Sequence, residues 1–594
     1  MTLKKSDIKK IVNIETNKIA YEIANKISDK TDVASLENNI VAIAYVLIII
    51  KEHPNSPTNS LDDFIDFITL DNRVKEALKR EITKDLWECA LELTHKDYDT
   101  EALKALILFN RNYSFNKNRM AYLSSTPDSL SELAKRILDI KNGDSLLDLC
   151  SGTGSFFSRV AIDNKDVNYN GVEINYKVND IAVLRTSLIT DVYNFEIGDA
   201  FTYNAVISGG GIYVKNMFDK IFSNYPFNVR LDVQAECKIH IRDYYRINHN
   251  ICFGASSDWI LNAKIVSMLK ENGKAVAIMT NGATLNKNDK DIRKFLVQRG
   301  NVEAVINLPE KLFPGINISV SMIVFGNNNK FVRLINAEKN FSEVDKQIVL
   351  SENNISEILE KLSYGGNDTI DIEINSEKLK ENDYKLYAPY YTNKPLISEG
   401  EPFGNVIKSI SRGSQRPDAL KDAISDSPTE YKYVSLSNIN NGLVDINNEG
   451  QYLKEITKGF SKYVIPDNAM ILSKIATPTF RSAIVNSEYN QKLVATGNIY
   501  IIEIDTTKAN PYYIQAFFDS DLGEKTLLHS SIGTVAKTIS AEALKNMIIP
   551  LPSLEKQNEI ASKYQAYLDE LVILKNKVNK VIEKKRNCLE KGEI

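Results

Sequence analysis

The first 115 residues of the chain have the apolar spacing of α-helices. Apolar side chains recur three or four residues apart, as at Ile19, Ile23 and Ile27, and hardly any glycine interrupts them. This spacing places the side chains on one face of a helix. The pattern predicts a helical bundle over residues 1–115, which serves either as a docking and clamping domain or as a covering layer for the next domain.

From residue 116 the pattern changes to short apolar strands that alternate with helical stretches. That alternation is typical of an open α/β sheet with helices on its faces, so residues 116–340 are predicted to form one Rossmann-like domain. Residues 341–400 are mixed and polar and predict a connector. Its tyrosines, among them Tyr390 and Tyr391, either pack inside this connector or form an exposed basic surface.

The remaining chain has a third pattern, in which short strands and turns dominate residues 401–555. This predicts a mixed α+β domain. A long helix is expected over residues 556–594, where apolar positions alternate spacings of four and three, and such a heptad seam favours a partner helix. The seam consists of Ile560, Tyr564, Tyr567, Leu571, Leu574, Val578 and Val581. The whole chain is therefore expected to be a multidomain α/β protein.

Composition limits the class of protein. At 594 residues the chain is too long for one hydrophobic core, and its 43% hydrophobic and 25% charged residues are ordinary for globular proteins. The net charge of −4 means that any nucleic-acid surface must be local. The most apolar run, Ile40 to Ile50, is far shorter than the roughly 20 residues that span a bilayer. It predicts a buried helix and no membrane partner.

Cysteine and histidine usage points to a reducing compartment. The five cysteines include no C-x-x-C pair, and only five histidines are present. Neither a disulfide framework nor a zinc site is indicated, and no metal is expected. The amino terminus has no apolar signal core. These features favour a cytoplasmic protein.

Residues 145–154 carry the first chemical pattern, an apolar strand followed by a glycine-rich turn and a helix. This order is typical of dinucleotide and nucleoside sites. Asp148 at the strand end would repel a pyrophosphate, whereas it could accept hydrogen bonds from an ammonium group. The turn Cys150-Ser151-Gly152-Thr153-Gly154 therefore suits a cofactor that has an amino-acid end and no phosphate.

Two further acids follow at the ends of later strands. Glu173 comes about 20 residues after the turn, where a carboxylate can bind both hydroxyls of a ribose. Asp199, which precedes Ala200, could accept a hydrogen bond from an adenine amino group. A glycine turn, a ribose acid and an adenine acid in this order suggest S-adenosylmethionine.

The next strand ends in Asn224-Tyr225-Pro226-Phe227. An amino nitrogen on a nucleobase is a poor nucleophile because its lone pair is delocalised into the ring, so an enzyme must draw its hydrogens toward acceptors. The side-chain oxygen of Asn224 and a neighbouring backbone carbonyl are suitable acceptors. Phe227 can stack against a base that has left the helix. The motif predicts methyl transfer to an exocyclic amine, at the sheet edge where the cofactor motifs lie.

Residues 116–335 resemble an amino-group DNA methyltransferase, and most of all the methylation subunit of type I restriction-modification systems. The order of the motifs is that of gamma-class adenine enzymes. The resemblance implies transfer to N6 of a flipped adenine, with Asn224 Oδ1 and the carbonyl of residue 225 binding the amine and Phe227 stacking on the base. Thr126 and Pro127, which could also simply open a helix, match the family as well. The implied cofactor-binding residues are Thr126, Pro127, Asp148, Cys150, Ser151, Gly152, Gly154, Glu173, Asp199 and Ala200.

One position departs from the family pattern. The family usually has Asn-Pro-Pro-Phe or Asn-Pro-Pro-Tyr, whereas here the second position is Tyr225. Since that residue is expected to act through its backbone oxygen, the acceptor is retained, but the φ restriction that proline supplies is lost.

Residues 401–594 resemble one target-recognition domain, with its trailing helix, from a type I specificity subunit. A natural specificity subunit carries two such halves, and this chain carries one. The resemblance implies sequence-specific binding of double-stranded DNA. The candidate DNA contacts, each of which can also be read as a solvated surface charge, are Arg412, Arg416, Lys474, Arg481 and Lys537.

The combined interpretation is a site-specific adenine-N6 DNA methyltransferase that is part of, or derived from, a restriction-modification system. Three alternatives are a bifunctional restriction enzyme, a catalytically weak DNA-binding or specificity component, and an enzyme that methylates a protein glutamine or RNA. A convincing nuclease centre is not evident in the first 115 residues. The terminal helix could join two chains in a homodimer or fold back on the amino-terminal bundle, and a separate restriction subunit is a further expected partner.

Overall fold

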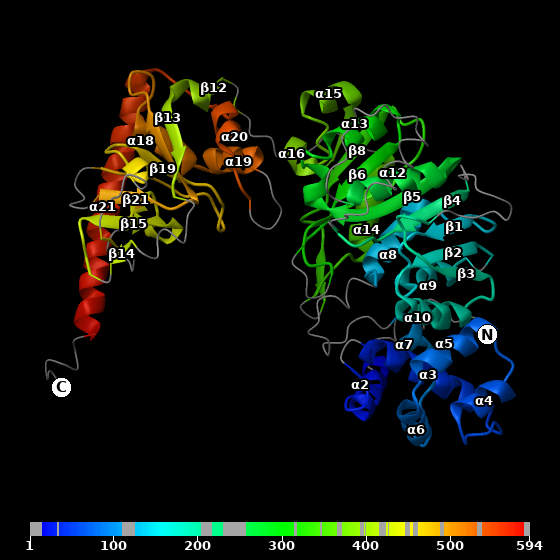
Figure 1. Ribbon diagram of the computed structural model, residues 1–594. Helices are drawn as coiled ribbons and strands as arrows, with labels where there is room; N and C mark the ends of the chain where they lie inside the picture. Colours follow the sequence, from blue (N-terminus) through cyan, green and yellow to red (C-terminus); the bar gives the residue numbers. More distant parts are fainter. Residues whose placement is uncertain are drawn as a thin grey trace. The chain divides into compact units, whose positions relative to one another are not determined.

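The chain forms two compact units, residues 1–392 and residues 393–594 (Figure 1). The structure is a computed structural model. It describes residues 15–32, 35–109, 125–164, 166–203, 217–227, 229, 257–313, 318–344, 347–364, 371–392, 397, 399–414, 423–425, 427–445, 452–454, 461–486, 492–531 and 537–586. The predicted domain boundary near residue 115 and the candidate Arg416 lie outside the described residues.

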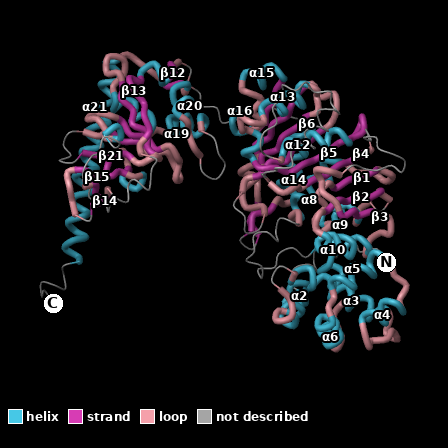
Figure 2. Tube along the Cα trace, viewed as in Figure 1, coloured by secondary structure: helices cyan, strands magenta, loops and turns pink. Residues whose placement is uncertain are grey.

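The first unit begins with a layer of helices. The layer comprises α2 (Glu15–Ile27), α3 (Leu36–Glu52), α4 (Leu61–Phe67), α5 (Asn72–Glu81), α6 (Lys84–Leu93) and α7 (Thr100–Phe109) (Figure 2). The apolar run from Ile40 to Ile50 lies in α3 and is almost wholly buried, which confirms the predicted buried helix. No helix in the described part of the chain is long and apolar enough to cross a membrane.

A nine-stranded sheet forms the centre of the first unit, in the order β11-β8-β6-β7-β5-β4-β1-β2-β3. The neighbouring strands β5, β4, β1, β2 and β3 run parallel to one another, whereas β7 is antiparallel to both β5 and β6. The predicted α/β fold with a mostly parallel sheet is therefore confirmed. The strands are β1 (Ser145–Asp148), β2 (Asn168–Glu173), β3 (Tyr193–Ile197), β4 (Phe218–Ser223), β5 (Leu269–Thr280), β6 (Val302–Asn307), β7 (Val320–Phe325), β8 (Phe331–Asn336) and β11 (Asp371–Asn375), with a separate hairpin of β9 (Ser342–Val344) and β10 (Gln347–Val349).

Helices cover both faces of this sheet. One face packs on α8 (Asp128–Leu138), α9 (Ser155–Ala161), α10 (Tyr176–Ser187) and α14 (Glu352–Tyr364). The other face packs on α12 (Asp258–Met268), α13 (Lys290–Gln298), α15 (Ser376–Glu381) and α16 (Ala388–Thr392). Within β1, Leu146 faces the first layer and its neighbour Leu147 faces the second, as the alternation of a strand requires.

The amino-terminal helices share a core with the sheet. One apolar cluster runs from α2 and α3 through α8 to α10 and on to the sheet. Polar contacts reinforce the junction: Arg80 of α5 makes a two-bonded ion pair with the buried Asp180 of α10, with Nε to Oδ2 at 2.8 Å and Nη2 to Oδ1 at 2.6 Å. The helices α2 to α7 therefore form a covering layer of the first unit.

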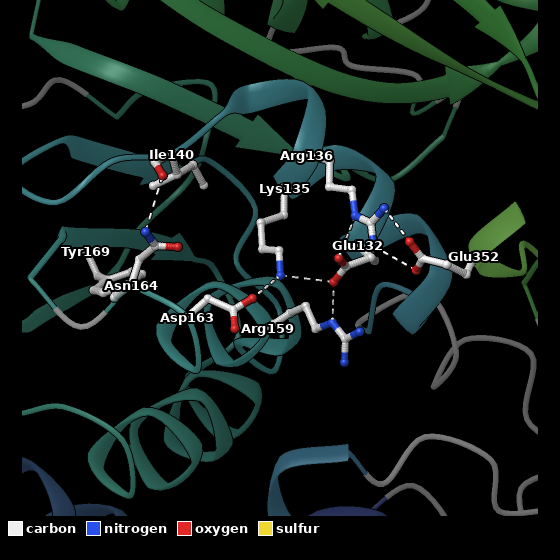
Figure 3. A network of polar contacts seen from close by, with 9 residues as sticks. All are labelled: Glu132, Lys135, Arg136, Ile140, Arg159, Asp163, Asn164, Tyr169 and Glu352. Carbon is white, nitrogen blue, oxygen red and sulfur yellow. Dashed lines mark hydrogen bonds and ion pairs between the residues drawn. The ribbon is translucent and has the colours of Figure 1, made fainter. Parts of the chain in front are cut away.

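A network of charges fixes α8, whose first residues follow Thr126. The buried carboxylate of Glu132 lies between Arg136, Lys135 and Arg159, at 2.9, 3.0 and 2.8 Å (Figure 3). Arg136 also reaches Glu352 of α14, at 2.6 Å. The network thus joins α8 to α9 and to α14.

The second unit contains two small sheets. The first has the order β13-β22-β19-β20 and the second the order β14-β18-β15-β21. Their strands are β13 (Ile407–Arg412), β14 (Ile424–Ser425), β15 (Tyr431–Val434), β18 (Tyr452–Leu453), β19 (Met470–Ser473), β20 (Ser482–Ile484), β21 (Lys492–Ala495) and β22 (Ile499–Ile504). Short pairs are formed by β12 (Glu401–Pro402) with β23 (Ile548–Ile549) and by β16 (Ile439–Asn440) with β17 (Leu443–Val444). The helices α18 (Pro511–Phe518), α19 (Asp521–Ser530) and α20 (Ala541–Asn546) complete its core.

The predicted long helix is α21 (Leu554–Arg586). Its first turns pack on the second unit, where Ala561 and Leu568 are buried and the Tyr564 hydroxyl donates to Asp519. Further along, the helix exposes the rest of the predicted seam. The exposed seam residues are Tyr567, Leu571, Leu574, Val578 and Val581.

Candidate functional site

The glycine-rich turn connects the end of β1 to α9. Gly152 and Gly154 have φ of 53° and 70°, a left-handed conformation that glycine adopts without strain. A Cβ on Gly154 would lie 2.9 Å from the Cα of Ala182 in α10, so the turn and α10 could not approach as closely with another residue. The Ser151 amide donates to the Val172 carbonyl at 2.9 Å. The turn is therefore held against the end of β2.

The three predicted acids gather at one edge of the sheet. Because β1, β2 and β3 are parallel, Asp148, Glu173 and Asp199 all follow or end strands at the same edge. Glu173 accepts from the amide of Gly152 at 3.1 Å, through Oε2. Asp199 Oδ1 accepts from the Phe201 amide at 2.9 Å. Burial raises the pKa of the Cys150 thiol, and the nearby carboxylates of Asp148, Glu173 and Asp199 raise it further.

Electrostatics make this edge favourable for a cation. Asp148 is fully buried, and burial raises its pKa well above 3.8, with the nearby Glu173 carboxylate adding to the shift. Burial also raises the pKa of Glu173, opposed by the amides of Asn175, Gly152 and Ile174. A positively charged ligand group would stabilise the carboxylate forms of Asp148 and Glu173, whereas a phosphate would destabilise them.

Asn224 follows β4, directly beside β1. Its Nδ2 donates to Oγ1 of Thr126 at 3.1 Å, and both side chains are buried. The Thr126 amide in turn donates to Oγ of Ser155, at 3.0 Å, in the first turn of α9. Because the amide nitrogen of Asn224 is bonded to Thr126, the amide oxygen Oδ1 is directed away from Thr126. The structure thus brings together the predicted Asn224, Thr126 and the glycine turn.

The residues after Asn224 are fixed by their side chains. Tyr225 is only 1% exposed, and its hydroxyl donates to Oδ1 of Asn262 in α12 at 3.0 Å. Pro226 is exposed. Phe227 is half-buried and packs edge-on against Phe313, with ring centroids 5.8 Å apart.

Sequence reasoning missed Asn262, Phe313 and Arg185. Arg185 of α10 is fully buried, and its Nε donates to the Ile107 carbonyl of α7 at 2.8 Å. Its Nη1 donates to the Thr153 carbonyl at 3.1 Å, which ties the glycine turn to the amino-terminal helices. The available signal was an arginine that directly follows the apolar run Ile181 to Leu184.

In the second unit, the structure brings some of the predicted basic residues together. Desolvation lowers the pKa of Lys474, and the positive charge of the nearby Arg412 lowers it further. The Lys537 carbonyl accepts from the Ala476 amide at 2.9 Å, which holds the segment of Lys537 beside that of Lys474. Arg481 instead donates to the carbonyls of Leu436 and Thr477, each at 3.0 Å, and so joins loops of its own unit.

No group of three or more potential metal ligands is found among the described residues. The two units match different family models. Residues 71–399 match the N-6 DNA methylase family, and residues 407–584 match the type I restriction modification DNA specificity domain.

Several curated proteins are similar to this chain. The type I restriction enzyme MpnII methylase subunit of Mycoplasma pneumoniae is 25% identical over 347 residues, covering 55% of this chain and 64% of that protein. The MjaIX methylase subunit of Methanocaldococcus jannaschii is 24% identical, covering 48% and 54% respectively. The EcoBI specificity subunit of Escherichia coli is 24% identical, covering 37% and 44%. The chain thus spans 44% to 64% of the length of these relatives.

Among solved structures, the type I restriction-modification methyltransferase subunit from Streptococcus thermophilus is similar in fold. It aligns with a TM-score of 0.50 and 17% identity, over 63% of this chain and 98% of that chain. This similarity supports the fold of the first unit as a methyltransferase fold.

Proposed function

This chain belongs to the N-6 DNA methylase family, and on that premise we propose that it transfers a methyl group from S-adenosylmethionine to N6 of adenine in duplex DNA. The second unit, which matches the specificity-domain family, would select the target sequence. The chain would act as the modification component of a cytoplasmic restriction-modification system, with a separate restriction subunit as a partner.

One observation carries this proposal: the Asn224 amide is held by Thr126 at the same sheet edge as Asp148, Glu173 and Asp199. Methyl transfer needs the amine and the methyl donor in one crevice. Oδ1 of Asn224 and the carbonyl of Tyr225 would accept the two hydrogens of the adenine amine and raise electron density on its nitrogen. Phe227, which packs against Phe313, would stack on the rotated base.

The residues of the edge fit the proposed cofactor. The Ser151 hydroxyl is buried without a hydrogen-bond partner among the described residues, so a bound polar group would satisfy it. Asp148 would accept from an ammonium group, Glu173 from ribose hydroxyls and Asp199 from an adenine amine. When bound, S-adenosylmethionine supplies an electrophilic methyl group on a cationic sulfonium. The remaining residues proposed to line this cofactor are Thr126, Pro127, Cys150, Gly152, Gly154 and Ala200.

DNA binding is assigned to the second unit. Arg412, Lys474 and Lys537 would contact phosphates from adjoining segments and set the register of the protein on the duplex. Arg416 and Arg481 stay predictions of the same kind. The exposed seam of α21 is proposed to pair two chains into a homodimer, because an apolar heptad stripe is stable in water only when covered.

The substitution Asn224→Ala tests the catalytic assignment. It removes the acceptor proposed for the reacting nitrogen, so transfer should fall by at least about 100-fold, while DNA binding stays near that of the wild type. The melting temperature should fall, because the substitution also deletes the buried hydrogen bond to Thr126. The measurement is incorporation of label from S-adenosylmethionine into DNA that lacks adenine methylation, with mapping of the modified base.

A matched control is Asn168→Ala, an exposed asparagine at the opposite end of β2, which should leave transfer unchanged. Transfer by Asn224→Ala at the wild-type rate would overturn the assignment. Label that enters RNA or protein in parallel incubations, and not DNA, would replace the proposed substrate class.

A further inference from the structure

Tyr225 stands between the two residues that are proposed to contact the target base. Its side chain points away from solvent, is only 1% exposed and lies in the apolar cluster between the sheet and α12. Its hydroxyl donates to Asn262 Oδ1 at 3.0 Å, across 37 positions of sequence. A hydroxyl bond at the far end of a buried ring restricts both the side chain and the peptide that carries it.

We propose that the Tyr225–Asn262 pair is a positioning device, which holds the backbone carbonyl of residue 225 where it can accept from the target amine. The inference rests on the proposed function and adds Asn262 to its machinery. Proline at residue 225 would fix the local φ by its ring; here a buried side-chain anchor supplies the constraint. Asn262 acts only through Tyr225 and does not touch the base.

The partner of Tyr225 is itself fixed. Asn262 is fully buried in α12, and its Nδ2 is directed at Sδ of Met279 in β5 at 3.6 Å. Trp259, one turn earlier in α12, donates from Nε1 to the Ala283 carbonyl at 2.9 Å. The acceptor oxygen therefore sits on a helix that is bonded to the sheet and to the turn after β5, and it cannot easily follow a displaced tyrosine.

The same helix also supports the cofactor side of the site. Lys264, two residues after Asn262, donates from Nζ to the Phe201 carbonyl at 2.8 Å, in the loop that carries Asp199. One element thus contacts both the catalytic segment and the proposed adenine-binding loop. Along the catalytic segment, three contacts act together: Thr126 on Asn224, Asn262 on Tyr225 and Phe313 on Phe227.

The bond can persist over the working range of pH. Burial raises the pKa of the Tyr225 phenol well above 10, so the hydroxyl keeps its proton and remains a donor. The Asn262 amide does not titrate. Positioning by this pair should therefore be independent of pH near neutrality.

The test compares three variants of the full-length chain: Tyr225→Phe, Asn262→Leu, and the two combined. Tyr225→Phe deletes the hydroxyl and leaves the ring in place. It should lower kcat between about 10-fold and 100-fold, the effect expected of a displaced reacting group, with KM for DNA and Kd for S-adenosylmethionine changed less than about 2-fold. Asn262→Leu should lower kcat by a similar factor.

The double variant separates positioning from stability. Each single substitution leaves one buried polar atom unpaired and should lower the melting temperature, whereas the double variant replaces both partners with apolar groups and should recover most of it. If the Tyr225–Asn262 bond positions the carbonyl of residue 225, kcat should stay low in the double variant. Recovery of kcat together with the melting temperature would show a merely structural role and overturn the inference.

A matched control is Tyr169→Phe, which deletes another buried hydroxyl of the first unit, one that donates to the Asn164 carbonyl near the opposite sheet edge. It should lower stability without lowering kcat. Equal kcat for wild type and Tyr225→Phe would overturn the positioning inference alone. Absence of methyl transfer to DNA by the wild-type chain would overturn the proposed function, and the inference with it.

Discussion

At the scale of single residues, the site contains a buried acid, Asp148, whose ionised form the fold stabilises too little to offset its burial. Asp148 is 1% exposed, and burial raises its pKa well above 3.8. Ionising Asp148 in the free protein therefore costs free energy. This is a reason to expect a ligand whose positive group stabilises the carboxylate. Cys150, in the same turn, has a thiol whose pKa is raised by burial and by three carboxylates, so it is not a reactive nucleophile at neutral pH.

Cofactor binding should release a proton from Asp148. Below its raised pKa the free protein holds a neutral carboxyl group, whereas an ammonium group binds the carboxylate. The affinity for S-adenosylmethionine should therefore increase as the pH rises toward the raised pKa of Asp148 in the free protein. Titration calorimetry in two buffers of different ionisation enthalpy measures the proton release.

The substitution Asp148→Asn is the control for this effect. It should weaken binding about 10-fold or more, the cost of losing a bond to a charged group, and it should reduce the pH dependence. In the absence of cofactor it should also stabilise the protein at neutral pH, because on folding the wild type must either bury the Asp148 carboxylate or protonate it. An unchanged pH dependence in the Asn variant would assign the released proton to another group, with Glu173 as the next candidate.

At the scale of elements, α8 connects stability to the site. Thr126, which holds Asn224, directly precedes this helix, and the charge network around Glu132 fixes the helix to α9 and α14 (Figure 3). Burial opposes the ionisation of Glu132, but Arg159, Lys135 and Arg136 outweigh it and lower its pKa from 4.5 to about 2. The carboxylate is therefore ionised throughout the physiological range.

Glu132→Gln should destabilise the first unit by up to about 3 kcal/mol at pH 7, the equivalent of the lowered pKa. A lowered carboxyl pKa contributes stability above 4.5, and that contribution is lost as the pH falls from 4.5 to about 2. The difference in unfolding free energy between wild type and variant should thus shrink over this range. Denaturant unfolding at several pH values measures it, and a difference independent of pH would contradict the assignment.

Element by element, the sequence predicted what depends on local patterns. The strand ends at Asp148 and Glu173 follow from apolar runs broken by turns, and Asn224 follows from the same pattern. The pairing of side chains could not be predicted, because it depends on how distant elements pack. Arg185 meets Ile107 across 78 positions, and Asn262 looks like any other polar residue within α12. The antiparallel β7 also lacks a local signal.

At the scale of the whole molecule, the chain consists of two units with separate cores, residues 1–392 and 393–594. The first carries the candidate transfer site, and the second carries the basic residues and α21. The part of α21 that packs on its own unit includes Gln557, Ala561 and Leu568, all buried. The helix continues to Arg586 with apolar side chains exposed.

A chain that ends at Asp569 should lose self-association. The deletion removes the exposed seam from Leu571 onward and the partly exposed Lys575–Asp445 ion pair, and it retains the buried contacts of Gln557, Ala561 and Leu568. The melting temperature should therefore stay within a few degrees of the full-length value. Sedimentation velocity should give a dimer for the full-length chain and a monomer for the shortened one. A full-length chain that sediments as a monomer at micromolar concentration would remove the proposed homodimer.

The core that α2 to α7 share with the sheet limits how this protein can exchange parts during evolution. A recombination joint near residue 115 would separate Arg185 from Ile107 and Asp180 from Arg80, and would uncover the apolar surface that lies between the helices and the sheet. A joint near residue 392 cuts between two complete cores. Exchange of the second unit is therefore expected to occur there, with the amino-terminal helices inherited together with the proposed transfer site.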